Sequence, residues 1–375
     1  MSTFNAVDER FMTRALALAQ RGRTRPNPMV GAVFVRDGVI LGEGFHQRAG
    51  EPHAEVEAIR AAKGESLKGA TLYVTLEPCC HQGKTGPCTE ALKPLGLARV
   101  VVAMLDPYPE VNGKGVEALR AAGIRVDVGL QEAQAQRINE AFVLSQTLQR
   151  PFLIAKWAMT LDGRTSTDLG ESKWITNAAA RQFVHQLRGQ VDAVMVGIGT
   201  VVRDDPQLTV RMPGHEGPQP LRIIVDGHLK IGPKARILND PDGGKVIIAT
   251  AQPSHREKRR ELTENGHDVV VVDSENRRVD PVRLMRELHA RGVQSILLEG
   301  GRQLAGSMFA ADMVDRVVGF LAPKILGGSA VGGPIVGWGI PEMEQALRLT
   351  DITVRQFGDN ICVDGRVDRR RRGRG

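Results

Sequence analysis

The sequence predicts an α/β protein of two domains. Its 375 residues are more than one ordinary hydrophobic core holds, which favours two cores. Apolar segments with almost no polar alternation are separated by helix-like patterns along the chain, and such strands are typical of a sheet covered by helices on both faces. A polar helical segment ends near Gln149 and a new strand pattern then begins, so we expect one domain over 1–149 and a second over 150–366.

The first domain is expected to begin with a helix over 8–20, whose apolar residues share one face. Two strands over 29–38 and 39–46 follow, and Asp37-Gly38 between them is typical of a hairpin turn. The other expected elements are helices over 53–62, 89–95, 115–123 and 131–149, and strands over 70–79, 99–107 and 124–130.

The second domain repeats this alternation. The expected strands cover 152–163, 192–201, 222–227, 245–251, 268–273, 295–301, 317–326, 351–357 and 361–367, and the expected helices cover 179–189, 280–292 and 302–312. We expect 367–375 to be a disordered, Arg-rich tail. Six Arg and one Asp within 366–375 account for most of the net charge of +7, so this charge says little about partners of the folded body.

Composition narrows the class of protein. No apolar run reaches the roughly 18 residues that a membrane-spanning helix needs, and the first residues lack the apolar core of a signal peptide. Cys79, Cys80 and Cys88 are clustered, which in a reducing compartment indicates metal binding or catalysis, while Cys362 is expected in the core. We therefore expect a cytoplasmic protein without a membrane partner.

His53, Glu55, Cys79 and Cys88 form the most specific pattern in the sequence. Two thiolates and one imidazole can hold zinc with a position left open for water, and a carboxyl group that does not bind the metal can move protons. We predict that His53, Cys79 and Cys88 bind Zn²⁺ and that Glu55 is the catalytic proton shuttle. The pattern resembles the H-x-E and P-C-x-x-C signature of zinc-dependent base deaminases.

The spacing of the cysteines departs from that signature. Eight residues separate Cys79 from Cys88, where the signature has two. Together with the His-Ala-Glu and Glu-Pro-Cys sequences, the pattern still predicts a metal centre. Two alternatives stay open: Cys80 in place of Cys79 as a ligand, and His81 as the fourth ligand of a site that is only structural.

Further motifs carry a closer resemblance. The chain is similar to the deaminase half of the bifunctional riboflavin-biosynthesis deaminase/reductase family at Pro26-Asn27-Pro28 with Val30-Gly31, His53-Ala54-Glu55, Thr75-Leu76-Glu77-Pro78-Cys79, His81 with Gly83-Lys84-Thr85, and Asp106-Pro107 with Pro109. The longer cysteine spacing is the expected form in that family. The resemblance implies a cytidine-deaminase-like, three-layer α/β/α domain. It also implies that His81 and Lys84 meet the ribose phosphate of the substrate, for which a cation is suited, and that Asn27 contacts its sugar or base.

In the second domain the residues alone say less. Glu299-Gly300-Gly301 ends a strand before a helix, which lets a backbone approach a phosphate, although taken alone the pattern is more typical of a tight turn. The resemblance to the reductase half of the family is carried by Lys156-Trp157-Ala158-Met159-Thr160-Leu161-Asp162-Gly163, Glu171-Ser172 with Trp174-Ile175-Thr176, Thr200 with Asp204-Asp205-Pro206 and Leu208-Thr209, and Glu299-Gly300-Gly301. It implies a dihydrofolate-reductase-like α/β fold that uses NADPH.

The same resemblance implies roles for individual residues of the second domain. NADPH would be bound by Ala158, Trp174, Thr200, Asp204, Gly301, Arg302, Gln303, Leu304, Ala305, Gly306 and Ser307, and the substrate by Ser172, Arg188, Leu208, Arg211 and Glu299. Lys156 and Asp204 are the candidate catalytic residues, to polarise the sugar carbon or to deliver a proton. Arg188 and Arg211 suit a phosphate chemically, and the alternative for both is a solvated surface arginine.

The resulting hypothesis is two consecutive reactions on one small molecule. A phosphoribosylaminopyrimidine would be deaminated in the first domain, and its ribosyl side chain would then be reduced to ribityl with NADPH in the second. One alternative is a nucleic-acid base deaminase with an accessory domain, which aromatic content of only 4% does not favour. Another is a non-catalytic zinc or RNA-binding protein. We expect no nucleic-acid partner, and a homo-oligomer, either a dimer or a tetramer.

Overall fold

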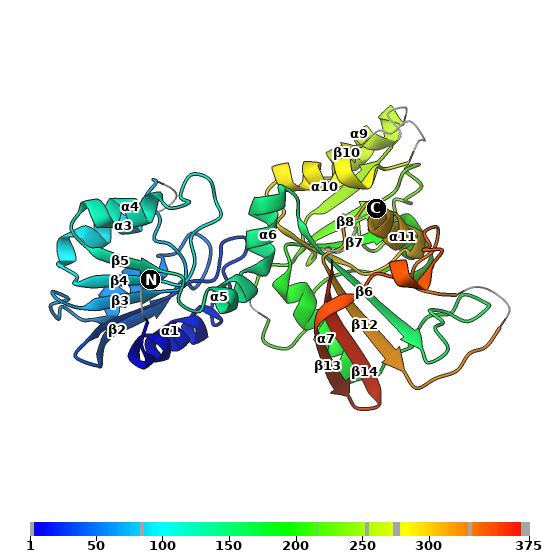
Figure 1. The fold of residues 1–375 in the computed structure, drawn as a ribbon. Helices are drawn as coiled ribbons and strands as arrows, with labels where there is room; N and C mark the ends of the chain where they lie inside the picture. The colour runs from blue at the N-terminus through cyan, green and yellow to red at the C-terminus, as the bar shows by residue number, and fades with distance from the viewer. Residues whose placement is uncertain are drawn as a thin grey trace. The chain divides into compact units, whose positions relative to one another are not determined.

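The computed structural model describes residues 4–82, 86–215, 217–251, 255–272, 278–328 and 332–368. Lys84 and the predicted tail from 369 onward lie outside these described residues. The chain divides into two compact units, Met1–Gln149 and Arg150–Gly375, each of which is described by itself below. Figure 1 shows the sheet and helices of each unit.

A five-stranded mixed sheet forms the centre of the first unit, in the order β2-β1-β3-β4-β5. Its strands are β1 (Gly31–Arg36), β2 (Val39–Phe45), β3 (Thr71–Val74), β4 (Arg99–Val102) and β5 (Arg125–Val128). β1 is antiparallel to β2 and β3, whereas β3, β4 and β5 are parallel. The predicted hairpin is confirmed: Asp37 and Gly38 have φ of 52° and 77°, as a tight hairpin turn requires.

Helices cover both faces of this sheet. They are α1 (Ala6–Ala19), α2 (Ala54–Ala61), α3 (Cys88–Leu92), α4 (Lys114–Ala121), α5 (Glu132–Ile138) and α6 (Glu140–Leu148), with a short 3₁₀ turn at Lys93–Leu95. Residues of α2, α3 and α4 pack into one apolar core, and residues of α1 and α5 pack into a second core on the opposite face. The predicted three-layer α/β/α arrangement is therefore confirmed (Figure 1).

The single helix expected over 131–149 is wrong, because the chain breaks at Asn139 between α5 and α6. Asn139 has φ −106° and ψ 25°, which is outside the helical region. Its side chain accepts from the Met29 N–H at 2.7 Å and donates to the Met29 carbonyl at 2.9 Å. These two bonds hold the Asn139 side chain against the segment before β1, at the position where the chain leaves the helical conformation.

The second unit is built on a nine-stranded sheet in the order β10-β9-β8-β7-β11-β6-β12-β14-β13. Its strands are β6 (Phe152–Thr160), β7 (Ala193–Gly197), β8 (Leu221–Val225), β9 (Val246–Thr250), β10 (Asp268–Val271), β11 (Ser295–Leu298), β12 (Arg316–Ala322), β13 (Leu349–Phe357) and β14 (Asn360–Val367). All strands from β10 to β12 in that order are parallel, and β14 is antiparallel to its two neighbours. The predicted α/β class is confirmed for this unit too.

The helices of the second unit differ from expectation at two places. They are α7 (Ala178–Gln190), α8 (Ile198–Asp204), α9 (Arg256–Glu264), α10 (Pro281–Ala290) and α11 (Arg302–Ala310), with a 3₁₀ turn at Met343–Gln345. The strand expected over 192–201 ends at Gly197, since α8 begins at once. The highly charged α9 was not expected, because it buries only Leu262. Val367, which the expected last strand and the expected tail both include, belongs to β14 and donates its N–H to the Asp315 carbonyl at 2.8 Å.

Among the described residues, none of the helices combines the length and the apolar character that a membrane span requires.

Candidate functional site

The predicted zinc ligands come from three segments of the first unit that meet at the carboxyl end of β3. His53 is the N-cap of α2 with extended backbone angles, and Cys88 is the first residue of α3. The His53 Nδ1 atom lies 3.2 Å from the Cys88 Sγ atom and 3.5 Å from the Cys79 Sγ atom. The three ligand atoms all lie within 4.8 Å of one another, so an imidazole and two thiols face a common point.

The loop that carries Cys79 is fixed by backbone contacts to α3. The N–H of Cys88 donates to the Cys79 Sγ atom at 3.3 Å, and the N–H of Thr89 donates to the Cys79 carbonyl at 3.1 Å. A side-chain hydrogen bond with Cys88 outweighs burial and lowers the pKa of Cys79 to about 4. One imidazole and two thiols, with no fourth protein ligand in the cluster as described, fit a zinc ion that keeps one coordination position open.

Glu55 lies in the first turn of α2, outside the ligand cluster and only 3% exposed. Burial, followed by the nearby Cys79, raises the pKa of Glu55 to about 7. A carboxyl group with such a pKa can take up and release a proton near neutral pH. The burial and the pKa of Glu55 therefore suit the predicted proton shuttle.

The structure does not favour the alternative ligands. In the described part of the chain the metal-binding cluster contains neither Cys80 nor His81. The Cys80 Sγ atom instead lies 4.0 Å from the Glu110 carbonyl oxygen. His81 is placed against Tyr108, with 5.9 Å between the ring centroids, and its Nδ1 atom is buried without a hydrogen-bond partner among the described residues.

Two residues that the sequence analysis did not assign a role support this centre. His46 is 3% exposed, its Nε2 atom is 3.1 Å from the Asn27 Nδ2 atom, and its ring lies edge-on to that of His53 at 5.3 Å. Glu77 accepts from the N–H groups of Asp106, Gly113 and Val116 at 3.1, 2.8 and 3.0 Å. The sequence offered only a weak signal for these two roles, because Glu77 directly precedes Pro78-Cys79 and His46 lies shortly before His53. Their burial is seen only in the structure. Asn27 is thus linked to the metal centre through His46.

A second charged centre lies in the second unit around Glu299. Arg188 on α7 grips the Glu299 carboxylate through Nε and Nη2 at 2.5 and 2.9 Å, and the Lys156 Nζ atom of β6 is 3.6 Å from Glu299 Oε2. Burial raises the pKa of Glu299, but the charges of Arg188 and Lys156 outweigh it and hold the pKa at about 2. Burial lowers the pKa of Lys156. Arg188 is therefore not a solvated surface arginine, because its guanidinium is paired with Glu299.

The predicted cofactor residues gather where β7 and β11 end. A Cβ atom on Gly301 would lie 3.1 Å from the Gly197 N atom, and one on Gly300 would lie 2.7 Å from the Thr200 Oγ1 atom, so only glycine allows this approach. Gly301, at φ 89°, precedes the nine-residue helix α11, whose first N–H groups can face a phosphate. This arrangement fits the phosphate groups of a dinucleotide.

The remaining predicted residues of the second unit lie on several elements. Ala158 is in β6, Thr200 and Asp204 are in α8, and Arg302, Gln303, Leu304, Ala305, Gly306 and Ser307 are in α11. The Ser172 Oγ atom donates to Asp204 Oδ1 at 3.2 Å, and the 62% exposed Trp174 lies under Arg181 at 4.4 Å. Ala305 and Gly306 face the core rather than solvent.

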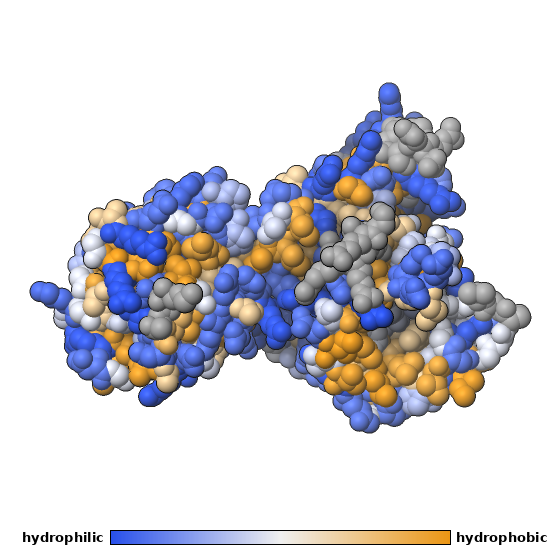
Figure 2. All heavy atoms as spheres, in the orientation of Figure 1, coloured by the Kyte–Doolittle hydropathy of each residue, from blue (hydrophilic) through white to orange (hydrophobic). Residues whose placement is uncertain are grey.

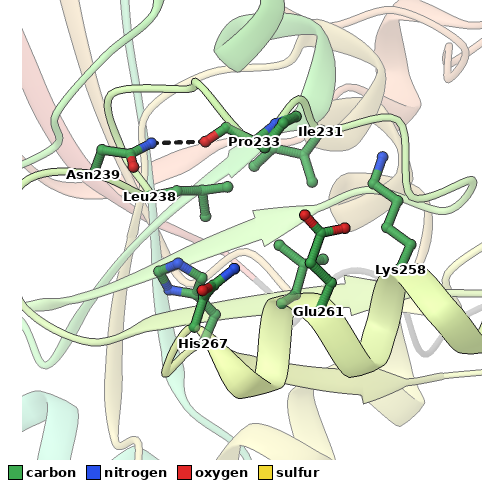
Figure 3. A pocket seen from close by; sticks show the side chains of 9 residues that line it. Ile231, Pro233, Leu238, Asn239, Lys258, Glu261 and His267 are labelled. Carbon is green, nitrogen blue, oxygen red and sulfur yellow. Dashed lines mark hydrogen bonds between the residues drawn. The ribbon is translucent and has the colours of Figure 1, made fainter.

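A separate cavity of about 260 Å³ lies beside α9, and Figure 3 shows its lining. Two of its polar side chains bind neighbouring backbone: Asn239 Nδ2 donates to the Pro233 carbonyl at 2.8 Å, and Lys258 Nζ to the Leu229 carbonyl at 2.7 Å. None of the predicted site residues lines it. We assign it no role in the chemistry.

Comparison with known proteins agrees with both centres. Residues 5–104 match the family model of the cytidine and deoxycytidylate deaminase zinc-binding region, and residues 151–363 match that of the RibD C-terminal domain. The riboflavin biosynthesis protein RibD of Aquifex aeolicus is 43% identical over 359 residues, which cover 95% of this chain and 98% of that protein. The chain belongs to the RibD family. The Escherichia coli RibD is 42% identical over 369 residues, covering 95% and 98% of the two chains.

Solved structures of RibD proteins have the same fold. Acinetobacter baumannii RibD, form 1, superposes with a TM-score of 0.87 at 38% identity, covering 96% of this chain and 99% of that one. A Thermotoga maritima deaminase/reductase superposes with a TM-score of 0.83 at 36% identity and the same coverage. The chain is thus a bifunctional enzyme of riboflavin biosynthesis, with a zinc-binding deaminase domain and an NADPH-dependent reductase domain.

Proposed function

We propose that residues 1–149 deaminate a diaminohydroxyphosphoribosylaminopyrimidine and that residues 150–366 reduce the resulting 5-amino-6-(5-phosphoribosylamino)uracil. The Thermotoga maritima relative is a deaminase and a reductase of these two compounds. The observation that carries the proposal is the convergence of His53, Cys79 and Cys88 beside the buried Glu55. The alternatives of a nucleic-acid base deaminase and of a non-catalytic zinc or RNA-binding protein are not favoured.

In the deamination, His53, Cys79 and Cys88 would hold the zinc ion. Zinc in such a site lowers the pKa of a water molecule, so that the water becomes a nucleophile near neutral pH. As water attacks the ring carbon that bears the amine, Glu55 takes one of its protons and gives it to the ring nitrogen. Glu55 then takes the second proton from the hydroxyl group formed on that carbon and gives it to the departing amine, so that ammonia leaves and a carbonyl group remains. Asn27, held by His46, would contact the sugar or base, and His81, together with Lys84, would contact the ribose phosphate.

In the reduction, residues around Glu299 would hold the product of the first step. NADPH supplies the hydride when it is bound at Ala158, Trp174, Thr200, Asp204 and the stretch from Gly301 to Ser307. Ser172, Arg188, Leu208, Arg211 and Glu299 would bind the substrate, Arg188 by fixing Glu299. As the hydride reaches the sugar carbon of the open-chain side chain, Lys156 or Asp204 delivers the accompanying proton.

The proposal includes a cytoplasmic location, a small-molecule substrate and no nucleic-acid partner. Most of the excess of basic charge lies in 366–375, so the net charge says little about partners of the folded units. We also propose that the chain forms a homo-oligomer, a dimer or a tetramer. The strand at the edge of the large sheet, β13, exposes Ile352 and Val354 at 56% and 64%, and Figure 2 shows apolar side chains gathered over this edge.

The proposal is tested by giving the purified enzyme the diaminopyrimidine and NADPH. We expect zinc to co-purify, ammonia to be released, and one NADPH to be oxidised for each ammonia. Oxidation of NADPH without ammonia release, or ammonia release from cytosine in single-stranded DNA instead, would contradict the proposed substrates. Sedimentation of the intact chain at micromolar concentration tests the oligomer, and a monomer would contradict it.

A further inference from the structure

The segment 208–211 of the second unit belongs to no helix or strand; its first three residues are buried and Arg211 is exposed. Leu208, Thr209 and Val210 are 3%, 4% and 4% exposed. Leu208 has a positive φ of 61°, a conformation that is unfavourable for a residue with a side chain and that persists only where the surroundings enforce it. Buried backbone N–H and C=O groups need hydrogen-bond partners. This segment pairs with no strand, and side chains provide several of these partners.

Gln219 supplies two of these partners. The N–H of Val210 donates to the Gln219 Oε1 atom at 2.7 Å, and the Gln219 Nε2 atom donates to the Val210 carbonyl at 3.1 Å. A side-chain amide thus pairs with Val210 as a residue of a neighbouring strand would. Because the pairing uses both a donor and an acceptor, a glutamate or an alanine at this position cannot reproduce it.

Two side chains of α7 supply two more. The N–H of Arg211 donates to the His185 Nδ1 atom at 3.2 Å, and the Arg188 Nη1 atom donates to the Thr209 carbonyl at 2.9 Å. His185 and Arg188 are three residues apart, so they lie on the same face of the helix. Arg188 also grips Glu299. One helix face therefore fixes both the carboxylate and the backbone of segment 208–211.

His185 is suited to accept this bond. Its Nδ1 atom receives the Arg211 N–H, so in the neutral ring the proton is on Nε2. Burial and the positive charges of Arg188 and Arg211 lower the pKa of His185 to about 4. The ring therefore stays neutral, and keeps its acceptor, near neutral pH.

We propose that His185 and Gln219 are positioning residues of the reductase, which hold the backbone of segment 208–211 so that Leu208 and Arg211 meet the pyrimidine substrate beside Glu299. This rests on the proposed role of Leu208 and Arg211 in substrate binding. Neither His185 nor Gln219 touches the reacting atoms in this account. They act by holding the backbone of the segment. Without their hydrogen bonds, we expect Leu208 to relax out of its unfavourable conformation.

The test uses the full-length enzyme with zinc and NADPH. In Gln219→Ala and His185→Ala we expect the KM for the phosphoribosylaminouracil to rise roughly three- to tenfold, as for the loss of a buried hydrogen bond, with a smaller change in kcat. The KM for NADPH should stay unchanged, which reports that the second unit is folded, and the rate of deamination should stay unchanged because its site lies in the first unit. His185→Asn keeps an acceptor near Nδ1 and should restore most of the affinity.

Gln207→Ala is the matched control, since the Gln207 amide donates to Asp240 at 3.2 Å and not to the segment backbone; it should leave all constants unchanged. If Gln219→Ala and His185→Ala leave the substrate KM unchanged while Arg211→Ala raises it, the positioning role is overturned and the proposed substrate site stands. If Arg211→Ala also has no effect, the substrate-binding role of the segment is wrong. Equal rises in the KM for NADPH would show a purely structural role and would also overturn the inference.

Discussion

At the scale of single residues, the chemistry depends on how burial and neighbouring charges set the pKa of each titratable group. Glu55 is buried beside thiols, and its pKa of about 7 suits proton transfer in both directions. Glu299 is equally buried but is held by Arg188 and Lys156, so its pKa of about 2 keeps it charged and fixed in place. The same residue type is thus a proton carrier in one unit and a fixed anion in the other.

Replacing the cysteines one at a time separates the ligand from its neighbour. Losing a residue that only hydrogen-bonds to a metal ligand lowers metal affinity roughly 10- to 100-fold. Cys79→Ala removes a ligand itself, so we expect a larger fall in zinc affinity. Cys80→Ala should keep its zinc, because the Cys80 Sγ atom faces the Glu110 carbonyl oxygen. Metal content after dialysis against a chelator measures both. Zinc loss in Cys80→Ala with retention in Cys79→Ala would exchange the two assignments.

The Glu299 carboxylate should make stability depend on pH. Its pKa is about 2 in the folded protein against an ordinary value of 4.5. Its contribution, on the order of 3 kcal/mol, is therefore complete above about pH 4.5 and is lost as the pH falls toward 2. The free energy of unfolding of the second unit, measured from pH 6 to 3, should fall more steeply in the wild type than in Glu299→Gln. Parallel curves would contradict this reading.

At the scale of elements, the ends of strands and the starts of helices place the functional groups. In the first unit Cys79 follows β3, His53 precedes α2 and Cys88 opens α3. In the second unit the close approach of Gly197 and Gly301 joins the ends of β7 and β11. Parallel strands bring their carboxyl ends to one edge of the sheet, and helix starts there offer N–H groups. Both proposed sites use this edge.

Packing of α4 against the cysteine loop makes one glycine decisive. A Cβ atom on Gly115 would lie 2.1 Å from the Pro78 carbonyl oxygen, next to Cys79. Gly115→Ala must displace that loop, at a cost of about 1–3 kcal/mol, so we expect weaker zinc binding and slower deamination. Glu117→Ala, at an exposed position of the same helix, is the control and should behave as wild type. A Gly115→Ala enzyme with unchanged zinc affinity would show that the loop does not depend on this contact.

Local features could be predicted from the sequence, and contacts between distant segments could not. The hairpin at Asp37 and the predicted strand segments follow from turn residues and apolar runs, which are local signals. By contrast, the contact between Arg188 and Glu299 joins residues 111 positions apart, and no local pattern shows that they meet. Asn139 breaks a helix through a contact with the segment before β1. α9 could not be predicted because it buries only Leu262, so its sequence carries no apolar stripe.

At the scale of the whole molecule, the chain carries two separate chemistries. The residues proposed for deamination all lie in Met1–Gln149, and those proposed for reduction all lie in Arg150–Gly375. The similarity to the Aquifex aeolicus RibD extends over 95% of the chain, so it includes both units. Each activity should therefore respond only to changes in its own unit.

The most direct test of this account is Glu55→Ala in the full-length enzyme, assayed for both activities and for zinc. We predict that ammonia release falls by about 10²- to 10⁴-fold, the usual contribution of a general acid–base group, while zinc content is unchanged. NADPH oxidation should proceed at the wild-type rate when the phosphoribosylaminouracil is supplied directly. Near wild-type ammonia release from this variant would contradict the assignment of Glu55 as the proton shuttle, and with it the proposed deamination site.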